Sequence, residues 1–301
     1  MEARMAIADI LLCIDPTTVA EGRLKLAVNL AQAHKAHLNT CYIMPEERGA
    51  LIGTGIAGVP VIPAVGMVGI AGTLSPGVDP AAAVVPQVAA EAERADTVEQ
   101  YFRAELRLHG LGGEWHLFFP GETGAFIELA KTVDLIILGQ PSPDFRSTGF
   151  RPEDIVVAAA RPILVIPYAG TFETAGRRAL VAWDGTREAV RAVNDALPLL
   201  GDAEVVTVTF VGAQEKSLEQ HRPSLQRIVD HLLRHGIPAK PEETLQGGIA
   251  ISDILLSRAA DLAADLIVCG AYHHSQLREA LIGGVSRELL RHMTVPVLMS
   301  H

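Results

Sequence analysis

Short apolar runs alternate with amphipathic stretches along most of the chain. Residues 179–183 form a run without a charged side chain, and residues 204–211 are rich in valine and threonine. Continuous apolar runs of this length are typical of parallel strands that are covered on both faces. Thr186 is a candidate N-cap for a helix between these two strands. Apolar residues follow it at helical spacing (Ala189, Val190, Val193, Ala196 and Leu197).

The same alternation continues beyond residue 211. Further helices are expected at residues 218–235, 251–264 and 285–292, and further strands at residues 266–269 and 295–299. Gly236 and Pro238 mark the end of the first of these helices. Alternating strands and helices predict an α/β fold, in which a parallel sheet carries helices on both of its faces.

The chain contains one structural unit twice, in the same order. The apolar run that ends at Asp15 resembles the run that ends at Asp184, which lies 169 positions later. The segment at residues 134–139 resembles the segment at residues 265–270, with an offset of 131. The two offsets differ by 38, which indicates that the first copy carries extra chain between Asp15 and Asp134.

The extra chain is apolar and rich in glycine and proline. Residues 51–78 contain no charged residue, seven glycines and three prolines, and their 28 positions are enough to span a bilayer. A membrane span needs an unbroken hydrogen-bonded helix, however, and these prolines and glycines interrupt it. We therefore expect an apolar loop, folded over the first unit or buried against a partner. A dinucleotide motif G-x-G-x-x-G at residues 53–58 is a chance match, because Pro60 and Pro63 exclude the helix that it must open.

The repeat predicts two domains in one chain. They are expected at residues 1–169, with an insertion at about residues 45–90, and at residues 177–301, with a linker at residues 170–177. The last strands of the two units, at residues 163–166 and 297–299, are expected at sheet edges. Because exposed edges favour pairing, these strands are expected to pair with each other and form an intramolecular pseudo-dimer.

Composition indicates a folded, acidic protein. Hydrophobic residues make up 49% and charged residues 20% of the 301 positions, which excludes a disordered chain. The formal net charge of −10 disfavours binding to phosphate backbones, so no nucleic acid partner is expected. Cys13, Cys41 and Cys269 lie in apolar runs, as expected for thiols in a reducing compartment. Residues 1–9 contain no apolar signal core, so a cytoplasmic protein is expected.

Candidate chemistry lies where strands of the second unit end. Ligands of parallel α/β sheets bind beyond the carboxyl ends of the strands, where the winding reverses, and this selects Asp184 and the loop that begins at Gly270. The loop ends in a Gly-Gly-Val-Ser turn at residues 283–286, where a helix N-terminus and the Ser286 hydroxyl suit a phosphate. The alternative is that the two glycines only ease a turn. Nearby residues would add positive charge (His273, His274 and Arg278).

These motifs resemble those of the universal stress proteins, here in a tandem form with two such domains. Nucleotide-binding members have an Asp at the end of the first strand. After the fourth strand they carry Gly, two residues, Gly, nine residues, Gly, and then Ser or Thr. Residues 265–270 and 283–286 fall at this spacing, and the resemblance covers nearly the whole chain twice, apart from the insertion. It implies two Rossmann-like domains of the adenine-nucleotide alpha hydrolase type.

The resemblance also implies where ATP, ADP or AMP would bind. Asp184 would meet the adenine and ribose, and Val211 would lie beside the base. The ribose and phosphates would be held by residues of the loop and the turn (Gly270, His273, Gly283, Gly284, Val285 and Ser286). His273 takes the position of the second family glycine, where its side chain either crowds the phosphates or donates to them. Gly284 stands where Ser or Thr is usual.

The first unit departs further from the family pattern. Gly139 is retained, but two prolines and an acid follow it, and Pro152-Glu153-Asp154 stands in place of the glycine turn. Two carboxylates at a helix N-terminus mimic an anion rather than bind one. This unit is therefore not expected to hold ATP in the family manner. Asp15 is retained, either as a helix cap or as part of a different ligand site that involves the inserted loop.

Histidines offer weaker alternatives. His231 and His235 lie one helical turn apart and are interpreted as a solvated helix face rather than half of a metal site. Four other histidines would have to gather in space to hold zinc (His273, His274, His292 and His301). No P-loop and no nucleophile elbow occurs, so we assign no catalytic residue and no metal ligand.

Three hypotheses for function follow. The first is a regulatory or stress-response module that binds an adenine nucleotide in its C-terminal half and changes a surface that a protein partner reads. The second is a slow ATPase in which Asp184 or a histidine orients water, which requires Mg²⁺ beside the phosphates. The third is a nucleotide-free interaction protein that uses the apolar insertion. Each applies to the intramolecular pseudo-dimer or to a homodimer of the chain.

Overall fold

The secondary structure follows the predicted alternation of strands and helices. The computed structural model describes residues 7–14, 20–44, 80–119, 121–140, 152–271 and 284–301. The expected insertion core at residues 51–78 lies outside these ranges, as do five of the singled-out positions (Asp15, His273, His274, Arg278 and Gly283). No helix within the described ranges is both long and apolar enough to cross a membrane.

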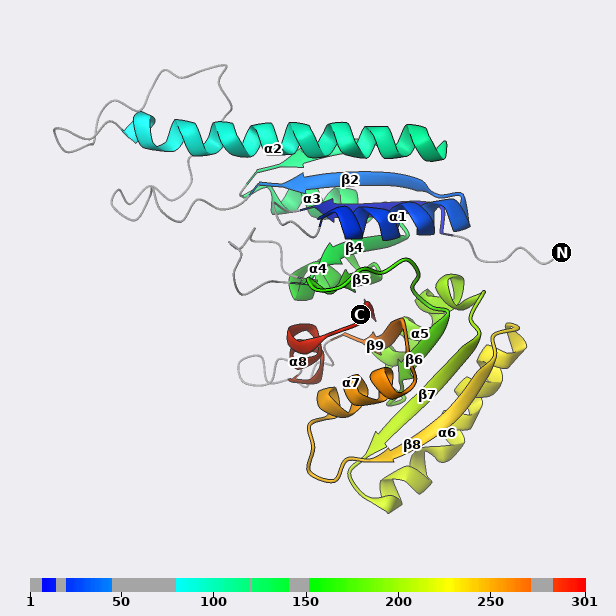
Figure 1. Cartoon of the computed structure of the whole chain (residues 1–301). Coiled ribbons are helices and arrows are strands. Elements are labelled where there is room, and N and C mark those ends of the chain that lie inside the picture. The colour runs from blue at the N-terminus through cyan, green and yellow to red at the C-terminus, as the bar shows by residue number, and fades with distance from the viewer. Residues whose placement is uncertain (1–6, 15–19, 45–79, 120, 141–151, 272–283) are drawn as a thin grey trace.

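Each half contributes five of the strands in the described part of the chain (Figure 1). The first half contains β1 (Asp9–Ile14), α1 (Ala20–His34), β2 (His37–Ile43), α2 (Pro80–His109), β3 (Trp115–Phe118), α3 (Thr123–Ala130), β4 (Leu135–Gly139), α4 (Pro152–Ala159) and β5 (Ile163–Ile166). The second half contains β6 (Arg178–Ala182), α5 (Arg187–Leu200), β7 (Val205–Gly212), α6 (Glu215–Arg234), β8 (Ala239–Leu245), α7 (Ile251–Asp261), β9 (Leu266–Gly270), α8 (Gly284–His292) and β10 (Val297–Ser300).

Element bounds of the second half differ from the sequence prediction by more than one residue at three places. Helix α6 begins at Glu215 rather than at residue 218, because its first turn is polar and carries no apolar periodicity. Helix α7 ends at Asp261, and Ala263 takes a left-handed conformation with φ of 48°. Strand β10 begins at Val297, directly after Pro296. Each difference lies at an element end, where periodicity carries the least information.

All ten strands belong to one sheet with the order β3-β2-β1-β4-β5-β10-β9-β6-β7-β8. Counted from either outer edge, the two halves have the same order of corresponding strands. The predicted pairing of the last strands is confirmed: β5 and β10 are antiparallel neighbours, with Leu164 opposite Leu298. All other neighbouring strands are parallel. The α/β fold with a mostly parallel sheet is thus as predicted.

Helices cover both faces of the sheet, which explains why the strands are apolar on both sides. Along β1, Leu12 belongs to one core cluster, whereas Leu11 and Cys13 belong to the other. Helices α1, α2, α5 and α6 contribute to the first cluster, and helices α3, α4, α7 and α8 contribute to the second. The face with α7 and α8 is the one that matters for the candidate site.

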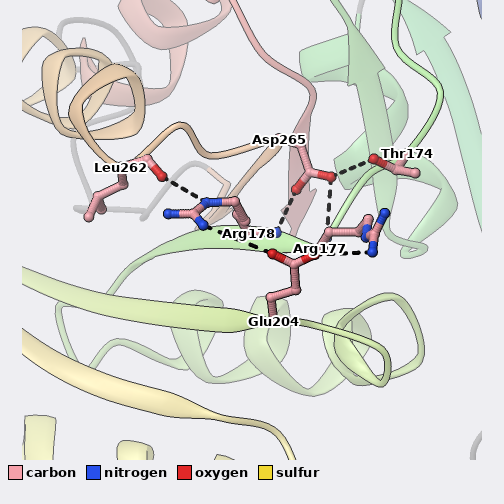
Figure 2. Close-up of polar contacts among 6 residues, drawn as sticks. All are labelled: Thr174, Arg177, Arg178, Glu204, Leu262 and Asp265. Atoms are coloured by element: carbon pink, nitrogen blue, oxygen red, sulfur yellow. Dashed lines mark hydrogen bonds and ion pairs between the residues drawn. The ribbon is translucent and has the colours of Figure 1, made fainter.

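A carboxylate contact occurs in the same place in both halves, at the amino ends of the strands. Asp265 accepts hydrogen bonds from the Thr174 hydroxyl (2.8 Å) and from the backbone N–H groups of Arg177 (3.2 Å) and Arg178 (2.9 Å) (Figure 2). It also accepts the Gly176 N–H at 3.1 Å. Asp134, at the equivalent position, accepts hydrogen bonds from the N–H groups of Ala8 and Asp9. These acids hold the chain that enters β6 and β1, so their role is structural.

The segment expected as a linker contacts helix α1. The Glu173 carboxylate lies 2.6 Å from the Lys25 ammonium, and the Asn29 amide donates to the Glu173 carbonyl at 2.9 Å. The Phe172 side chain packs against the core on the α1 side of the sheet. The segment between β5 and β6 is therefore attached to the first half by specific contacts.

Candidate functional site

The winding of the second half reverses between β6 and β9. Strand β6 pairs with β9 on one side and with β7 on the other. Asp184 lies two residues beyond β6, and Gly270 is the last residue of β9. Both positions therefore lie at the carboxyl edge beside the crevice in which parallel α/β sheets bind ligands.

Asp184 is exposed and organises the turn that leads into α5. Its Oδ1 atom accepts hydrogen bonds from the Thr186 N–H (3.0 Å) and from the Thr186 hydroxyl (2.6 Å). The Thr186 oxygen in turn accepts the N–H of Ala189, so the predicted N-cap of this helix is confirmed. Because both contacts of the carboxylate use Oδ1 and the residue faces solvent, the Asp184 carboxylate is accessible to a ligand.

Gly270 is required by a close approach of two backbones. A Cβ atom at this position would lie 2.7 Å from the Ala189 nitrogen and 2.7 Å from the Glu188 carbonyl carbon. No side chain fits between the end of β9 and the first turn of α5 at that distance. The retained family glycine thus has a packing role in addition to its proposed role in binding.

The Glu188 side chain is a buried acid at this junction that the sequence analysis did not single out. It is 2% exposed, its Cβ lies 2.8 Å from where a Gly270 Cβ would be, and its carboxylate pairs with Arg187. A carboxylate in the first turn of a helix is stabilised by the positive end of the helix dipole. The N-terminus of α5 thus already carries the negatively charged Glu188 and Asp184 side chains, and Thr186 caps it.

The N-terminus of α8 is the more open of the two helix ends. Gly284 and Val285 are exposed, whereas Ser286 is buried and its hydroxyl donates to the Gly270 carbonyl at 3.4 Å. This contact connects the beginning of α8 with the end of β9. The exposed first turn of α8 therefore offers backbone N–H groups and partial positive charge at the reversal point.

Val211 lies near the carboxyl end of β7, the strand next to β6. It is half-buried and packs on the core cluster that contains α7 and α8, as do Ala182 and Ile251. The structure thus places Asp184, Val211, Gly270 and the α8 turn along one edge of the sheet. His273 and Gly283, the remaining two predicted positions, lie outside the described residues.

Cys269 precedes Gly270 and is chemically protected. Burial, together with the negative charge of Asp184, raises the pKa of its thiol to about 12. At neutral pH the group is a protonated thiol, and only thiolates act as nucleophiles. Cys269 therefore contributes apolar volume beside the site.

The corresponding edge of the first half is filled by an arginine. Arg23 of α1 is 3% exposed and donates from Nη1 to the Cys13 carbonyl at 3.0 Å. A Cβ atom at Gly139 would lie 2.5 Å from its guanidinium carbon. Sequence analysis missed this residue because it lies far from Gly139 along the chain.

Among the described residues, the histidine alternatives gain no third ligand, and His273 and His274 lie outside those residues. The ring centroids of His231 and His235 lie 4.6 Å apart. Burial is the main cause that lowers the pKa of His231, and the charge of His235 is the second. The Nδ1 atom of His301 lies 3.0 Å from the Ala271 carbonyl oxygen, and His292 contacts Glu288 of its own helix. Within the described residues, no group of three or more His, Cys, Asp or Glu side chains is placed to hold a metal ion.

Comparison with known proteins gives the class of the second half. Residues 176–301 match the model of the universal stress protein family, so the expected Usp domain is supported there. The match does not extend into the first 175 residues, and it does not show the second Usp domain that the repeat predicts. No curated protein matches the chain by sequence.

Solved structures show the same fold over nearly the whole chain. A universal stress protein from Archaeoglobus fulgidus is similar with a TM-score of 0.65 and 13% identity, covering 97% of each chain. A putative universal stress protein from Pseudomonas aeruginosa has a TM-score of 0.56 and 18% identity, covering 98% of this chain and 93% of that one. At these identities the likeness shows the fold alone. It includes the first half, which has the strand order of the second.

Proposed function

We propose that the chain binds an adenine nucleotide at the carboxyl edge of β6, β7 and β9, and that it serves as a regulatory or stress-response module. The single observation that carries the proposal is the Ser286–Gly270 contact of 3.4 Å. It joins the exposed N-terminus of α8 to the reversal point of the sheet, which is where dinucleotide and nucleotide phosphates bind in such folds.

The described residues fit the two ends of a nucleotide differently. The first turn of α5 is matched by Glu188, Asp184 and Thr186, so phosphates would be repelled there and would lie at α8 instead. The exposed Asp184 carboxylate would accept hydrogen bonds from the ribose hydroxyls, and Val211 would offer apolar surface to the base. Gly284, Val285 and Ser286 would face the phosphates, and His273 and Gly283 belong to the same proposed set.

The first half would not hold a nucleotide in this manner. The guanidinium of Arg23 lies against Gly139, where a ligand of this half would have to approach, whereas the nearest described atoms to Gly270 are backbone atoms of α5 and the Glu188 Cβ. The proposal therefore assigns one nucleotide to each chain, in residues 177–301, and treats residues 1–169 as a related domain with a separate role.

Location and partners follow from the same proposal. Cys13, Cys41 and Cys269 are buried thiols, as expected in the reducing cytoplasm. A protein partner that reads the occupied state, and a homodimer of the chain, belong to the proposal as well. Any Mg²⁺ would enter with the phosphates.

Calorimetric titration with ATP, ADP, AMP and GTP, each with Mg²⁺ and with EDTA, tests the proposal. We expect one adenine nucleotide per chain and no comparable binding of GTP. Release of inorganic phosphate at a steady rate with Mg²⁺ would show an ATPase rather than a binding module. Failure of all adenine nucleotides to bind would overturn the proposal and leave the apolar insertion as the functional element to pursue.

A further inference from the structure

A glutamine of the first half is buried at the C-terminal end of α8. Gln140 follows β4 directly and is 5% exposed. Its Nε2 atom donates to the carbonyls of Leu290 (2.8 Å) and Arg291 (3.0 Å), which belong to the last turn of α8. Its Oε1 atom accepts the N–H of Tyr168 at 3.1 Å, two residues beyond β5.

These hydrogen bonds satisfy groups that need partners. The last four carbonyls of an α-helix have no partner within the helix, and a buried amide side chain is costly unless its own donors and acceptor are bonded. Gln140 meets both needs at once. It therefore fixes the C-terminal end of α8 to the ends of β4 and β5, across the junction between the halves.

The arrangement has no counterpart on the other side of the pseudo-dimer. The backbone contacts are the same, since Gln140 N–H donates to the Ile166 carbonyl (2.7 Å) and Ala271 N–H donates to the Ser300 carbonyl (2.8 Å). The side chains differ, however, because Ala271 has no group that could reach a helix end. Of the two equivalent positions, only the one in the first half carries a side chain that can cap a helix of the other half.

Helix α8 is the element whose two ends matter. It has nine residues and is about 14 Å long at 1.5 Å per residue, so only about two and a half turns separate its two ends. Its N-terminus carries the exposed Gly284 and Val285 and the Ser286 contact with Gly270. A shift at Leu290 and Arg291 would therefore displace the N–H groups at the opposite end.

We infer that Gln140 is a positioning residue for the nucleotide site of the C-terminal half, and that the first half serves as the fixed support for α8. This inference rests on the proposed function, because it assumes that the N-terminus of α8 faces the phosphates. It assigns a role to the first half that does not require that half to bind a ligand of its own.

The test uses two substitutions in the full chain and a matched control. Gln140→Met keeps the length of the side chain and removes all three hydrogen bonds, and we expect it to raise the Kd for ATP at least fivefold. Gln140→Glu places a carboxylate against the α8 carbonyls and is expected to raise the Kd further at pH 8. Asn29→Ala removes an amide contact between α1 and the linker and should leave the Kd within twofold of the original value.

The pH profile separates positioning from loss of packing. The carboxyl group that Gln140→Glu introduces would have a raised pKa, because it is buried and faces carbonyl oxygens. When protonated it can again donate a hydrogen bond to α8, so the ratio of its Kd to that of the unchanged protein should fall as the pH is lowered. Gln140→Met should show no such change in the ratio.

The outcomes are distinguishable. If the unchanged protein binds ATP and both Gln140 variants bind equally well, the inference is overturned while the proposed function stands. A weakened Gln140→Glu variant whose ratio does not change with pH also overturns it, since packing alone would then explain the loss. If the unchanged protein does not bind ATP, the proposed function fails and takes the inference with it. Faster backbone amide exchange in α8, but not in α7, is expected for Gln140→Met.

Discussion

The Ser286 hydroxyl donates to the Gly270 carbonyl across 3.4 Å, so the two glycine-containing segments of the candidate site meet although 16 positions separate these residues. Gly270 belongs to a strand that packs on the first turn of α5, and Ser286 belongs to the first turn of α8. This contact defines the junction of a strand end with two helix N-termini. The predictions below test separate parts of it.

Alanine at the two glycines should separate folding from binding. In Gly270→Ala the new Cβ would lie 2.7 Å from backbone atoms of α5, so we expect a loss of about 2–3 kcal/mol in the free energy of unfolding. In Gly284→Ala no described residue lies within 4 Å of the new Cβ, and stability should change by less than about 0.5 kcal/mol. Gly284→Ala should nevertheless raise the Kd for ATP more than tenfold, because the methyl group stands beside the phosphates. Urea unfolding and calorimetric titration measure the two effects, and equal binding by Gly284→Ala would contradict the placement of the phosphates.

The charge of Asp184 should matter for binding more than for folding. Asparagine at this position keeps an oxygen that can accept the hydrogen bonds from Thr186, the N-cap of α5, so Asp184→Asn should retain nearly full stability. Ribose hydroxyls would lose a carboxylate acceptor, and we expect the Kd for ATP to rise about tenfold, or about 1.4 kcal/mol. Asp184→Ala should in addition lose about 1 kcal/mol of stability. An unchanged Kd in both variants would place the ribose elsewhere.

Cys269 should resist alkylation and should weaken the fold in alkaline solution. Burial and the Asp184 charge raise its pKa from the ordinary 9.0 to about 12, so the folded protein keeps a proton that the unfolded chain loses. The contribution of the Cys269 thiol to the free energy of unfolding is therefore fully present below pH 9 and is lost as the pH rises from about 9 to 12. The free energy of unfolding of Cys269→Ala should fall less over this range. In a chain with Cys13 and Cys41 replaced by alanine, iodoacetamide at pH 8 should react only as fast as the protein unfolds; rapid reaction would show that Cys269 is accessible.

Removal of the two equivalent acids at the amino ends of the strands should destabilise the fold without affecting the site. The Asp265 carboxylate accepts four hydrogen bonds, whereas that of Asp134 accepts two. We expect Asp265→Ala to cost about 3 kcal/mol and Asp134→Ala to cost about 1–2 kcal/mol, because an acceptor lost from several N–H groups leaves each of them without its partner. Denaturant unfolding measures both values. The reverse order, or a changed Kd for ATP in either folded variant, would contradict a purely structural role.

The sequence predicts the fold well because the determining patterns are local or repeated. The apolar runs at β6 and β9 identify buried parallel strands, and the need to cover two edge strands predicts the pairing of β5 with β10. The place of the candidate site follows from the same patterns, since Asp184 and Gly270 end neighbouring strands. Among the elements of the second half whose ranges were predicted, only the ends shift, as at Glu215 and Val297. In the first half, α2 begins at Pro80, inside the stretch expected to be the insertion.

Other features of the site could not be predicted, because they depend on contacts between distant parts of the chain. Glu188 and Gly270 are 82 positions apart, and Gln140 reaches Leu290 across 150 positions. Neither Glu188 nor Gln140 belongs to a motif. A buried glutamate or glutamine cannot be distinguished from an exposed one by its spacing alone, since burial is decided by which elements pack together. The position of Arg23 against Gly139 was hidden for the same reason.

The most direct test of the central claim is to denature freshly purified protein and to identify and count the released small molecules by mass spectrometry. Gly284→Ala, purified in parallel, serves as the folded control. The account predicts about one adenine nucleotide per chain from the unchanged protein and far less from Gly284→Ala. Absence of nucleotide from the unchanged protein, together with failure to bind added ATP, would contradict the account.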